Sequence, residues 1–161
     1  MKPLVYIETS VISYLASKPA RDVVSIARQT ITHEWWDNYR DEYRVTVSAL
    51  VEEEVLGGDE DAAARRLAYI AELAYLDVSE EAVEISEKLL ESKAVPKGSE
   101  EDALHIGIAA SQGVDFLLTW NFKHINNASM RQKIADEIAS MGFKCPQLCS
   151  PEELGGIVND S

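Results

Sequence analysis

The chain has 161 residues, of which 46% are hydrophobic, so it is long enough to bury the core of one domain without disulfide bonds. Its 28 acidic and 15 basic residues give a formal net charge of −13 at pH 7. That charge argues against an extended nucleic-acid-binding surface, because such surfaces gain affinity by neutralising phosphates with Lys and Arg. It leaves room for a small active site in which a divalent ion bridges an acidic pocket to a phosphate.

The cysteines and the N-terminus indicate a reducing compartment. On one extended strand, Cys145 and Cys149 would lie about 13 Å apart, which is beyond the reach of a disulfide bond. No apolar stretch approaches the roughly 18 residues that a membrane span needs. Glu8 interrupts the first apolar run before a signal peptide could form. We therefore expect a cytoplasmic protein with two free thiols.

The first half of the chain alternates apolar strands with amphipathic helices. Residues 3–7 form an apolar run that stops at Glu8, which is typical of a buried strand with polar groups at its carboxyl end. Thr9 or Ser10 is placed to cap the next helix, which Pro19 ends. The following predicted elements are a long helix over residues 20–40, a strand over 43–47, a helix that Ser48 caps and that runs through Glu54 to Gly57 and Gly58, and a helix over 59–74.

The second half continues this alternation. The helix that Ser99 is placed to cap is apolar nearly all round as far as Ala110, which predicts that it is buried, so Asp102 near its start needs an explanation. We expect residues 1–154 to form a single domain and residues 155–161 to form a disordered tail. The other predicted elements are a strand over residues 75–78, a helix over 79–92, a loop over 93–98, a strand over 114–118, a helix over 129–141 and a strand over 144–149.

Strands that alternate with helices predict an α/β fold with a parallel sheet, and ligands of such sheets bind at the carboxyl ends of the strands. Glu8 and Asn121 follow predicted strands, and Glu54 lies in the helix after another. Asp102 lies in a helix that could point back to the same edge. The four side chains could therefore converge, although each also fits a structural role, as an acid near a helix start or as a turn residue.

Converging carboxylates point to a metal site. Carboxylates held close together repel one another, and burial raises their pKa further, so such a cluster is stable chiefly when a cation occupies it. Mg²⁺ or Mn²⁺ fits, because both prefer oxygen ligands. An ion in such a site could activate water and stabilise the leaving oxygen in phosphodiester hydrolysis.

Four segments, taken together and in this order, carry a family resemblance: YIETSVISYL, VSALVEEEVLGG, EEDALHIGIAA and DFLLTWNFKHINN. They resemble the PIN-domain ribonucleases, and most closely the VapC-type toxins of toxin–antitoxin pairs. The likeness covers about residues 3–127. It implies a three-layer PIN-like α/β fold, in which helices flank a central, mostly parallel sheet of four to five short strands.

The resemblance also assigns roles to individual residues. It implies that a divalent metal is held by Glu8, Glu54, Asp102 and Asn121, with the hydroxyl groups of Thr9, Ser10 and Thr119 in support. Glu53 is the alternative to Glu54, one position away. The family usually has Asp where this chain has Glu8, and an acid where it has Asn121. The site then has three formal negative charges, which should weaken its affinity for metal, particularly for a second ion.

Further residues near these four are candidates for binding substrate. His105 lies three residues after Asp102, and Lys123 and His124 follow Asn121, so each could contact a scissile phosphate. A hydrogen-bonded structural histidine or a solvated lysine is the alternative for each. Trp120 could stack on a base or lie in the core.

Three hypotheses about function fit these observations to different degrees, and the third fits poorly. The leading one is a metal-dependent endoribonuclease, for which the resemblance implies an RNA substrate, an antitoxin with a basic blocking segment, and a homodimer. The alternative is a catalytically weakened PIN-like module that binds RNA or a protein partner, which the departures at Glu8 and Asn121 motivate. A phospho-accepting receiver domain needs paired acids after the first strand, where this chain has Glu8 followed by two hydroxyl residues.

Overall fold

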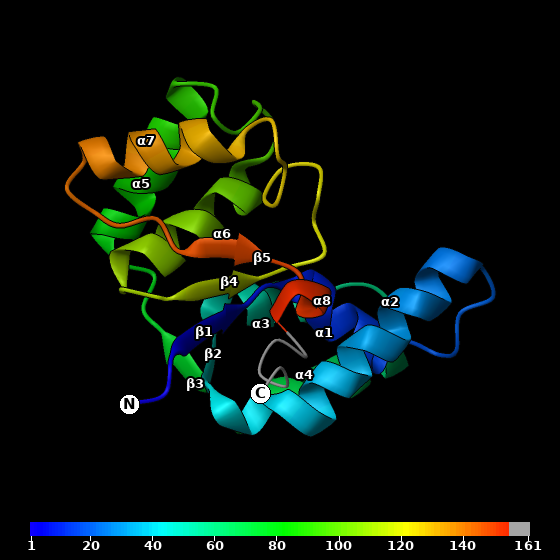
Figure 1. The fold of residues 1–161 in the computed structure, drawn as a ribbon. Coiled ribbons are helices and arrows are strands. Elements are labelled where there is room, and N and C mark those ends of the chain that lie inside the picture. The colour runs from blue at the N-terminus through cyan, green and yellow to red at the C-terminus, as the bar shows by residue number, and fades with distance from the viewer. Residues whose placement is uncertain (155–161) are drawn as a thin grey trace, which may run out of the picture.

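The computed structural model describes residues 1–154, and its centre is one parallel sheet (Figure 1). Among these residues the sheet has five strands in the order β3-β2-β1-β4-β5, and every neighbouring pair is parallel. This confirms the predicted α/β class and the predicted number of strands. The strands are β1 (Leu4–Ile7), β2 (Arg44–Ser48), β3 (Ala74–Leu76), β4 (Phe116–Leu118) and β5 (Gln147–Cys149).

Helices cover both faces of the sheet and complete three layers. Figure 1 shows α5, α6 and α7 on one side of the sheet and α1, α2 and α4 on the other. The α-helices are α1 (Thr9–Ala16), α2 (Val23–Glu34), α3 (Ala49–Val55), α4 (Glu60–Ile70), α5 (Glu80–Glu91), α6 (Glu100–Ser111), α7 (Arg131–Ser140) and α8 (Pro151–Leu154).

The strand order places a switch point at β1. The chain leaves β1 to form β2 on one side and later returns to form β4 on the other, so Tyr6 is in register with Thr46 and Leu117. Just past the strand, the N–H of Glu8 donates to the carbonyl of Leu118 at 3.0 Å. Ligands of open parallel sheets bind where the strand order reverses. Glu8 therefore lies at the place where the topology favours a site.

Helix α6 packs unusually close to α5. A Cβ atom added at Gly107 of α6 would lie 2.3 Å from the carbonyl oxygen of Ala82 in α5, a distance that only glycine permits. The middle of α6 is buried, as its all-round apolar pattern predicts. Because α6 carries Asp102 and His105, this contact also sets the position of two candidate site residues.

Two predicted helix caps are wrong, and both lie beside the candidate site. Neither Thr9 nor Ser10 caps α1; Glu8 occupies the capping position, and its side chain makes no capping hydrogen bond. Ser99 occupies the capping position of α6, but its hydroxyl contacts Nδ1 of His124 at 3.1 Å instead. In each case the hydroxyl forms a hydrogen bond with a side chain of the candidate site instead of capping the helix.

At two other helices a serine forms the expected kind of cap. Ser48 caps α3 as predicted, and Ser79 caps α5; their hydroxyls accept from the N–H groups of Val51 and Ala82. The predicted helix over residues 20–40 starts later, at Val23, and changes after α2 to a π-helical turn, Trp35–Tyr39.

Other element bounds also differ from those expected. The strands β3 and β5 and the helix α7 are each shorter than, or offset from, their predicted ranges, and α8 was not predicted. In β5 the strand begins only after Pro146, which has no N–H to donate to the ladder.

The remaining sequence-based expectations concern thiols, membranes and the tail. Cys145 and Cys149 are free, as predicted, and burial raises the pKa of their thiols to about 11 and about 12. Across residues 1–154, every helix is too short or too polar to cross a membrane. The tail predicted for residues 155–161 lies outside the described residues.

Candidate functional site

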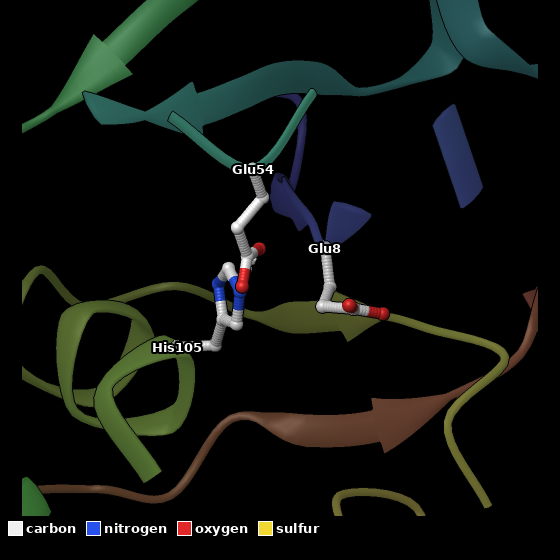
Figure 2. Close-up of side chains that lie close together, drawn as sticks. All are labelled: Glu8, Glu54 and His105. Atoms are coloured by element: carbon white, nitrogen blue, oxygen red, sulfur yellow. Dashed lines mark hydrogen bonds and ion pairs between the residues drawn. The ribbon is translucent and has the colours of Figure 1, made fainter. Parts of the chain in front are cut away.

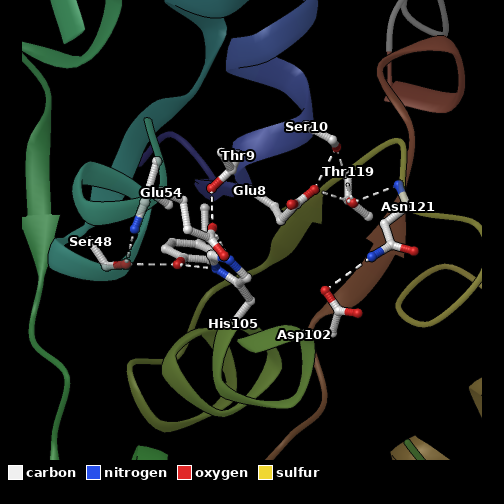
Figure 3. Close-up of polar contacts among 11 residues, drawn as sticks. Glu8, Thr9, Ser10, Ser48, Glu54, Asp102, His105, Thr119 and Asn121 are labelled. Atoms are coloured by element: carbon white, nitrogen blue, oxygen red, sulfur yellow. Dashed lines mark hydrogen bonds and ion pairs between the residues drawn. The ribbon is translucent and has the colours of Figure 1, made fainter. Parts of the chain in front are cut away.

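Polar side chains from four parts of the chain gather at the carboxyl edge of the sheet (Figure 3). They come from the end of β1 and the start of α1, from α3 behind β2, from the first turns of α6, and from the segment after β4. Parallel strands end at one edge of their sheet, so residues distant in sequence meet there.

Glu8 is buried and held by two hydroxyl groups. Its side chain is only 6% exposed, and its Oε1 accepts from the hydroxyls of Ser10, at 2.5 Å, and Thr119, at 2.6 Å. The Ser10 hydroxyl in turn accepts the N–H of Trp120 at 2.9 Å. The carboxylate is therefore oriented from both sides by groups that are themselves anchored.

Glu54 is held by a hydroxyl and an imidazole. Its Oε1 accepts from the Thr9 hydroxyl and lies 2.8 Å from Nε2 of His105. Burial alone would raise the pKa of Glu54, but the hydrogen bond and charge of His105, together with the Thr9 hydroxyl, hold this pKa below its usual value. The ionised carboxylate only accepts hydrogen bonds, so Nε2 of His105 carries the shared proton.

A buried chain of hydrogen bonds continues behind His105. Its Nδ1 lies 2.7 Å from the hydroxyl of Tyr6, which lies 2.8 Å from the hydroxyl of Ser48. Burial is the main cause that raises the pKa of Tyr6 far above its usual value, so the phenol keeps its proton. When the imidazole is neutral, Tyr6 donates to Nδ1 and His105 donates to Glu54.

Sequence reasoning missed Tyr6. The signal was its spacing, because Tyr6 and Glu8 are two residues apart and side chains two apart in a strand point to the same face. A polar aromatic residue in an otherwise aliphatic buried run, on the face that carries the first acid, could have been assigned to the site.

Asp102 and Asn121 form a second group. Nδ2 of Asn121 donates to Oδ1 of Asp102 at 3.1 Å, while its amide oxygen accepts the N–H groups of Lys123 and His124 at 3.2 and 3.0 Å. Nδ1 of His124 lies 3.0 Å from Oδ2 of Asp102. The Asn121 oxygen therefore faces its own loop, and its nitrogen faces the carboxylate.

One set of side chains has metal-binding geometry. Glu8, Glu54 and His105 each offer a ligand atom, and these atoms lie within 4.8 Å of one another (Figure 2). Asp102 is outside this set, but it is linked to it, because the N–H of Asn121 donates to the hydroxyl that Thr119 shares with Glu8. The structure thus brings all four predicted ligands to one edge. Hydrogen bonds connect Glu8 with Asn121 and Asp102 through Thr119, whereas Glu54 is held separately by Thr9 and His105.

Comparison with known proteins identifies the fold. No protein-family model and no curated protein matches the chain. Among solved structures, the chain is similar to VapC20 of Mycobacterium tuberculosis, described as a toxin that cleaves the sarcin-ricin loop, with a TM-score of 0.58 and 16% sequence identity. The match covers 86% of this chain and 95% of VapC20. The chain has a VapC-type PIN fold. This confirms the fold that the four sequence segments implied.

Within this PIN fold, the candidates for binding substrate lie at different depths. Lys123 is exposed, and about a quarter of the His124 side chain is exposed beside Asp102. His105 is buried, with both ring nitrogens engaged inside the protein. Trp120 is buried as well, and its Nε1 donates to the Thr32 hydroxyl at 2.8 Å. Its neighbour Phe122, which sequence reasoning did not consider, is 41% exposed.

Proposed function

We propose that this chain is a metal-dependent endoribonuclease and the toxin of a toxin–antitoxin pair. One observation carries the proposal: at the switch point of a PIN fold, carboxylate oxygens of Glu8 and Glu54 lie within 4.8 Å of each other, and His105 lies beside them and orients Glu54. Asp102 joins them through hydrogen bonds of Asn121 and Thr119. A cation would stabilise a cluster of this kind, since its carboxylates otherwise repel one another.

The donor set fits Mg²⁺ or Mn²⁺. Within residues 1–154, the hydrogen bonds to Glu8 and Glu54 all end on Oε1, which leaves both Oε2 atoms available as ligands. Oxygen donors suit Mg²⁺ and Mn²⁺, and the carboxylates of Glu8, Glu54 and Asp102 supply three negative charges. A divalent cation held there would activate water and stabilise charge on the phosphate during hydrolysis of RNA.

The residues around the carboxylates have positioning roles in this proposal. Ser10 and Thr119 orient Glu8, and Thr9 and His105 orient Glu54. Oriented ligands reduce the reorganisation that metal binding requires.

Asn121 was predicted from sequence as a fourth ligand. We assign it instead to holding Asp102, because its amide oxygen is engaged by two backbone N–H groups and its nitrogen faces the carboxylate. Lys123 and His124, near the surface beside it, are proposed to contact the RNA phosphates.

The proposed partners follow from charge and from the fold. A chain with a net charge of −13 attracts a basic segment strongly at low salt, so we propose an antitoxin with a basic segment that covers the carboxylates. VapC20 is described as a toxin, which supports the same assignment. The homodimer and the cytoplasmic location remain predictions from the sequence.

An RNA-cleavage assay with one matched pair of variants tests the enzyme. Single-stranded RNA labelled at one end is incubated with the protein and Mn²⁺ or Mg²⁺. Asp102→Asn should abolish metal-dependent cleavage and leave the fold intact, because it removes one ligand charge and keeps the shape. Glu53→Gln, on the exposed side of α3, should cleave like the wild type. Equal cleavage by the wild type and Asp102→Asn would reject the site, and RNA binding without any cleavage would reject the enzyme.

A growth assay tests the toxin role. Expression of the wild-type chain should arrest growth of a bacterial host, and expression of Asp102→Asn should not. Growth arrest by both proteins to the same extent would separate toxicity from the proposed site.

A further inference from the structure

Beside the candidate site, an arginine packs among aromatic rings. The guanidinium carbon of Arg28, in α2, lies 5.4 Å from the ring centre of Trp120 and 5.3 Å from that of Phe122. Its Nη1 donates to the hydroxyl of Tyr14, in α1, at 3.4 Å. The two rings after β4 meet edge to face, with centres 6.0 Å apart. We call Arg28, Tyr14, Trp120 and Phe122 the Arg28 cluster.

The cluster combines one buried, anchored ring with one exposed ring. Trp120 is 5% exposed and is anchored through Nε1 to Thr32, whereas Phe122 is 41% exposed. Arg28 is partly exposed, and within residues 1–154 it forms no ion pair with an acid. Within the described residues the guanidinium makes one hydrogen bond, to Tyr14, so four of its five N–H groups remain for a ligand. The two cation–π contacts also hold the guanidinium in place without neutralising it.

The position of the cluster ties it to the carboxylates. Trp120 stands between Thr119, which donates to Glu8, and Asn121, which donates to Asp102. The backbone N–H of Trp120 donates to the same Ser10 hydroxyl that binds Glu8. The rings after β4 thus share one short segment with the residues that hold two proposed ligands.

We infer that Arg28 and Phe122 form a subsite for the RNA strand next to the scissile phosphate, an inference that rests on the proposed function. The guanidinium of Arg28 pairs with a phosphate, which it can meet with two parallel hydrogen bonds. The exposed ring of Phe122 stacks on a base, and stacking of this kind tolerates every base.

Charge favours RNA over a protein segment as the occupant. The chain as a whole repels a phosphate strand, so a cation that has no acid within ion-pair distance has a large effect where the strand must enter. The basic segment expected of an antitoxin would instead be repelled by Arg28. The ring of Phe122 can stack on a base while the guanidinium of Arg28 pairs with a phosphate of the same strand.

The test measures RNA binding without cleavage, in EDTA, by the fluorescence anisotropy of a short single-stranded RNA over a range of salt concentrations. Phe122→Leu keeps an apolar side chain and removes the ring, and should weaken binding about tenfold with the salt dependence unchanged. Arg28→Gln should weaken binding and reduce the slope of log affinity against log salt by about 0.7, the value for one phosphate contact on a single strand. Arg28→Lys should keep the wild-type slope.

Arg40 supplies the matched control. Its guanidinium also lies over a tryptophan, at 4.2 Å from the ring of Trp36, but it precedes β2 and so belongs to the opposite edge of the sheet. Arg40→Gln should bind RNA like the wild type. Thermal unfolding of each variant checks that the fold is kept.

The outcomes separate the subsite from the proposed function. Wild-type affinity in both Phe122→Leu and Arg28→Gln would overturn the subsite and leave this face to a protein partner. An equal loss in Arg40→Gln would also overturn it, because the effect would then be general charge. RNA that binds through the cluster but is never cut in Mn²⁺ would reject the enzyme and retain the subsite.

Discussion

Nε2 of His105 lies 2.8 Å from Oε1 of Glu54, and this contact joins α6 to α3 across the carboxyl edge of the sheet. Behind it, Tyr6 and Ser48 extend the hydrogen bonds into the core. Glu54 is therefore held from the interior of the protein.

Removal of the imidazole should weaken metal binding before any RNA is present. His105→Gln disturbs the hydrogen bond that orients Glu54, and changes to groups that orient a ligand cost about tenfold or more in metal affinity. Tyr6→Phe should have a smaller effect in the same direction, because Tyr6 reaches Glu54 only through His105. Both are measured as the dissociation constant of Mn²⁺, from electron paramagnetic resonance of the free ion.

His33→Gln is the control for this measurement, since His33 lies in α2 and has no part in the chain of hydrogen bonds. It should bind Mn²⁺ like the wild type. Unchanged affinity in His105→Gln would show that Glu54 does not depend on this contact.

The lowered pKa of Glu54 predicts a pH dependence of stability in the metal-free protein. Its pKa lies below the usual value of 4.5 in the folded chain, so the folded carboxyl binds a proton more weakly than the unfolded one. Glu54 therefore adds stability above that usual value, and this contribution is lost as the pH falls through the lowered pKa. Between about pH 6 and about pH 3, the free energy of unfolding should fall less in Glu54→Gln than in the wild type.

Urea unfolding in EDTA measures this difference. Glu53→Gln removes one charge from the exposed side of the same helix and should follow the wild-type pH dependence. If Glu54→Gln and the wild type lost the same free energy on acidification, the favourable contacts of Glu54 would contribute nothing to stability.

An acid at position 121 should make the protein more dependent on metal. In Asn121→Asp the hydrogen bond from Nδ2 to Asp102 becomes a contact between two carboxylates, which lowers stability when no metal is bound. A cation then relieves this repulsion, so Mn²⁺ should raise the melting temperature of the variant more than that of the wild type. A smaller rise in the variant would show that position 121 is remote from the metal.

The close approach of α5 and α6 should tolerate no side chain at Gly107. Alanine usually stabilises a helix relative to glycine, but here its Cβ would meet the carbonyl of Ala82 at 2.3 Å. We expect Gly107→Ala to lower the free energy of unfolding by about 1–3 kcal/mol, as overpacking does. Gly57→Ala is the control, because its added Cβ would meet its nearest neighbour at an ordinary 3.5 Å. Equal stability of the two variants would contradict the packing argument.

Local signals predicted the fold well because they depend on residues near one another in the chain. Apolar runs that stop at polar residues located β1 and β4, and Ser48 caps its helix as expected. The same signals were wrong at Thr9, Ser10 and Ser99, whose hydroxyls bind side chains of the site instead.

By itself, the sequence determined the class of the fold and the edge of the sheet at which the candidate acids lie. These follow from periodicity and from the rule that parallel strands end together. Only the tertiary structure decided how the acids are held. The orientation of the Asn121 amide, the Tyr6–His105–Glu54 chain and the place of Arg28 over Phe122 each depend on contacts between distant segments. Hydrogen bonds of this kind are set by which side chains meet in space, and no local pattern encodes that choice.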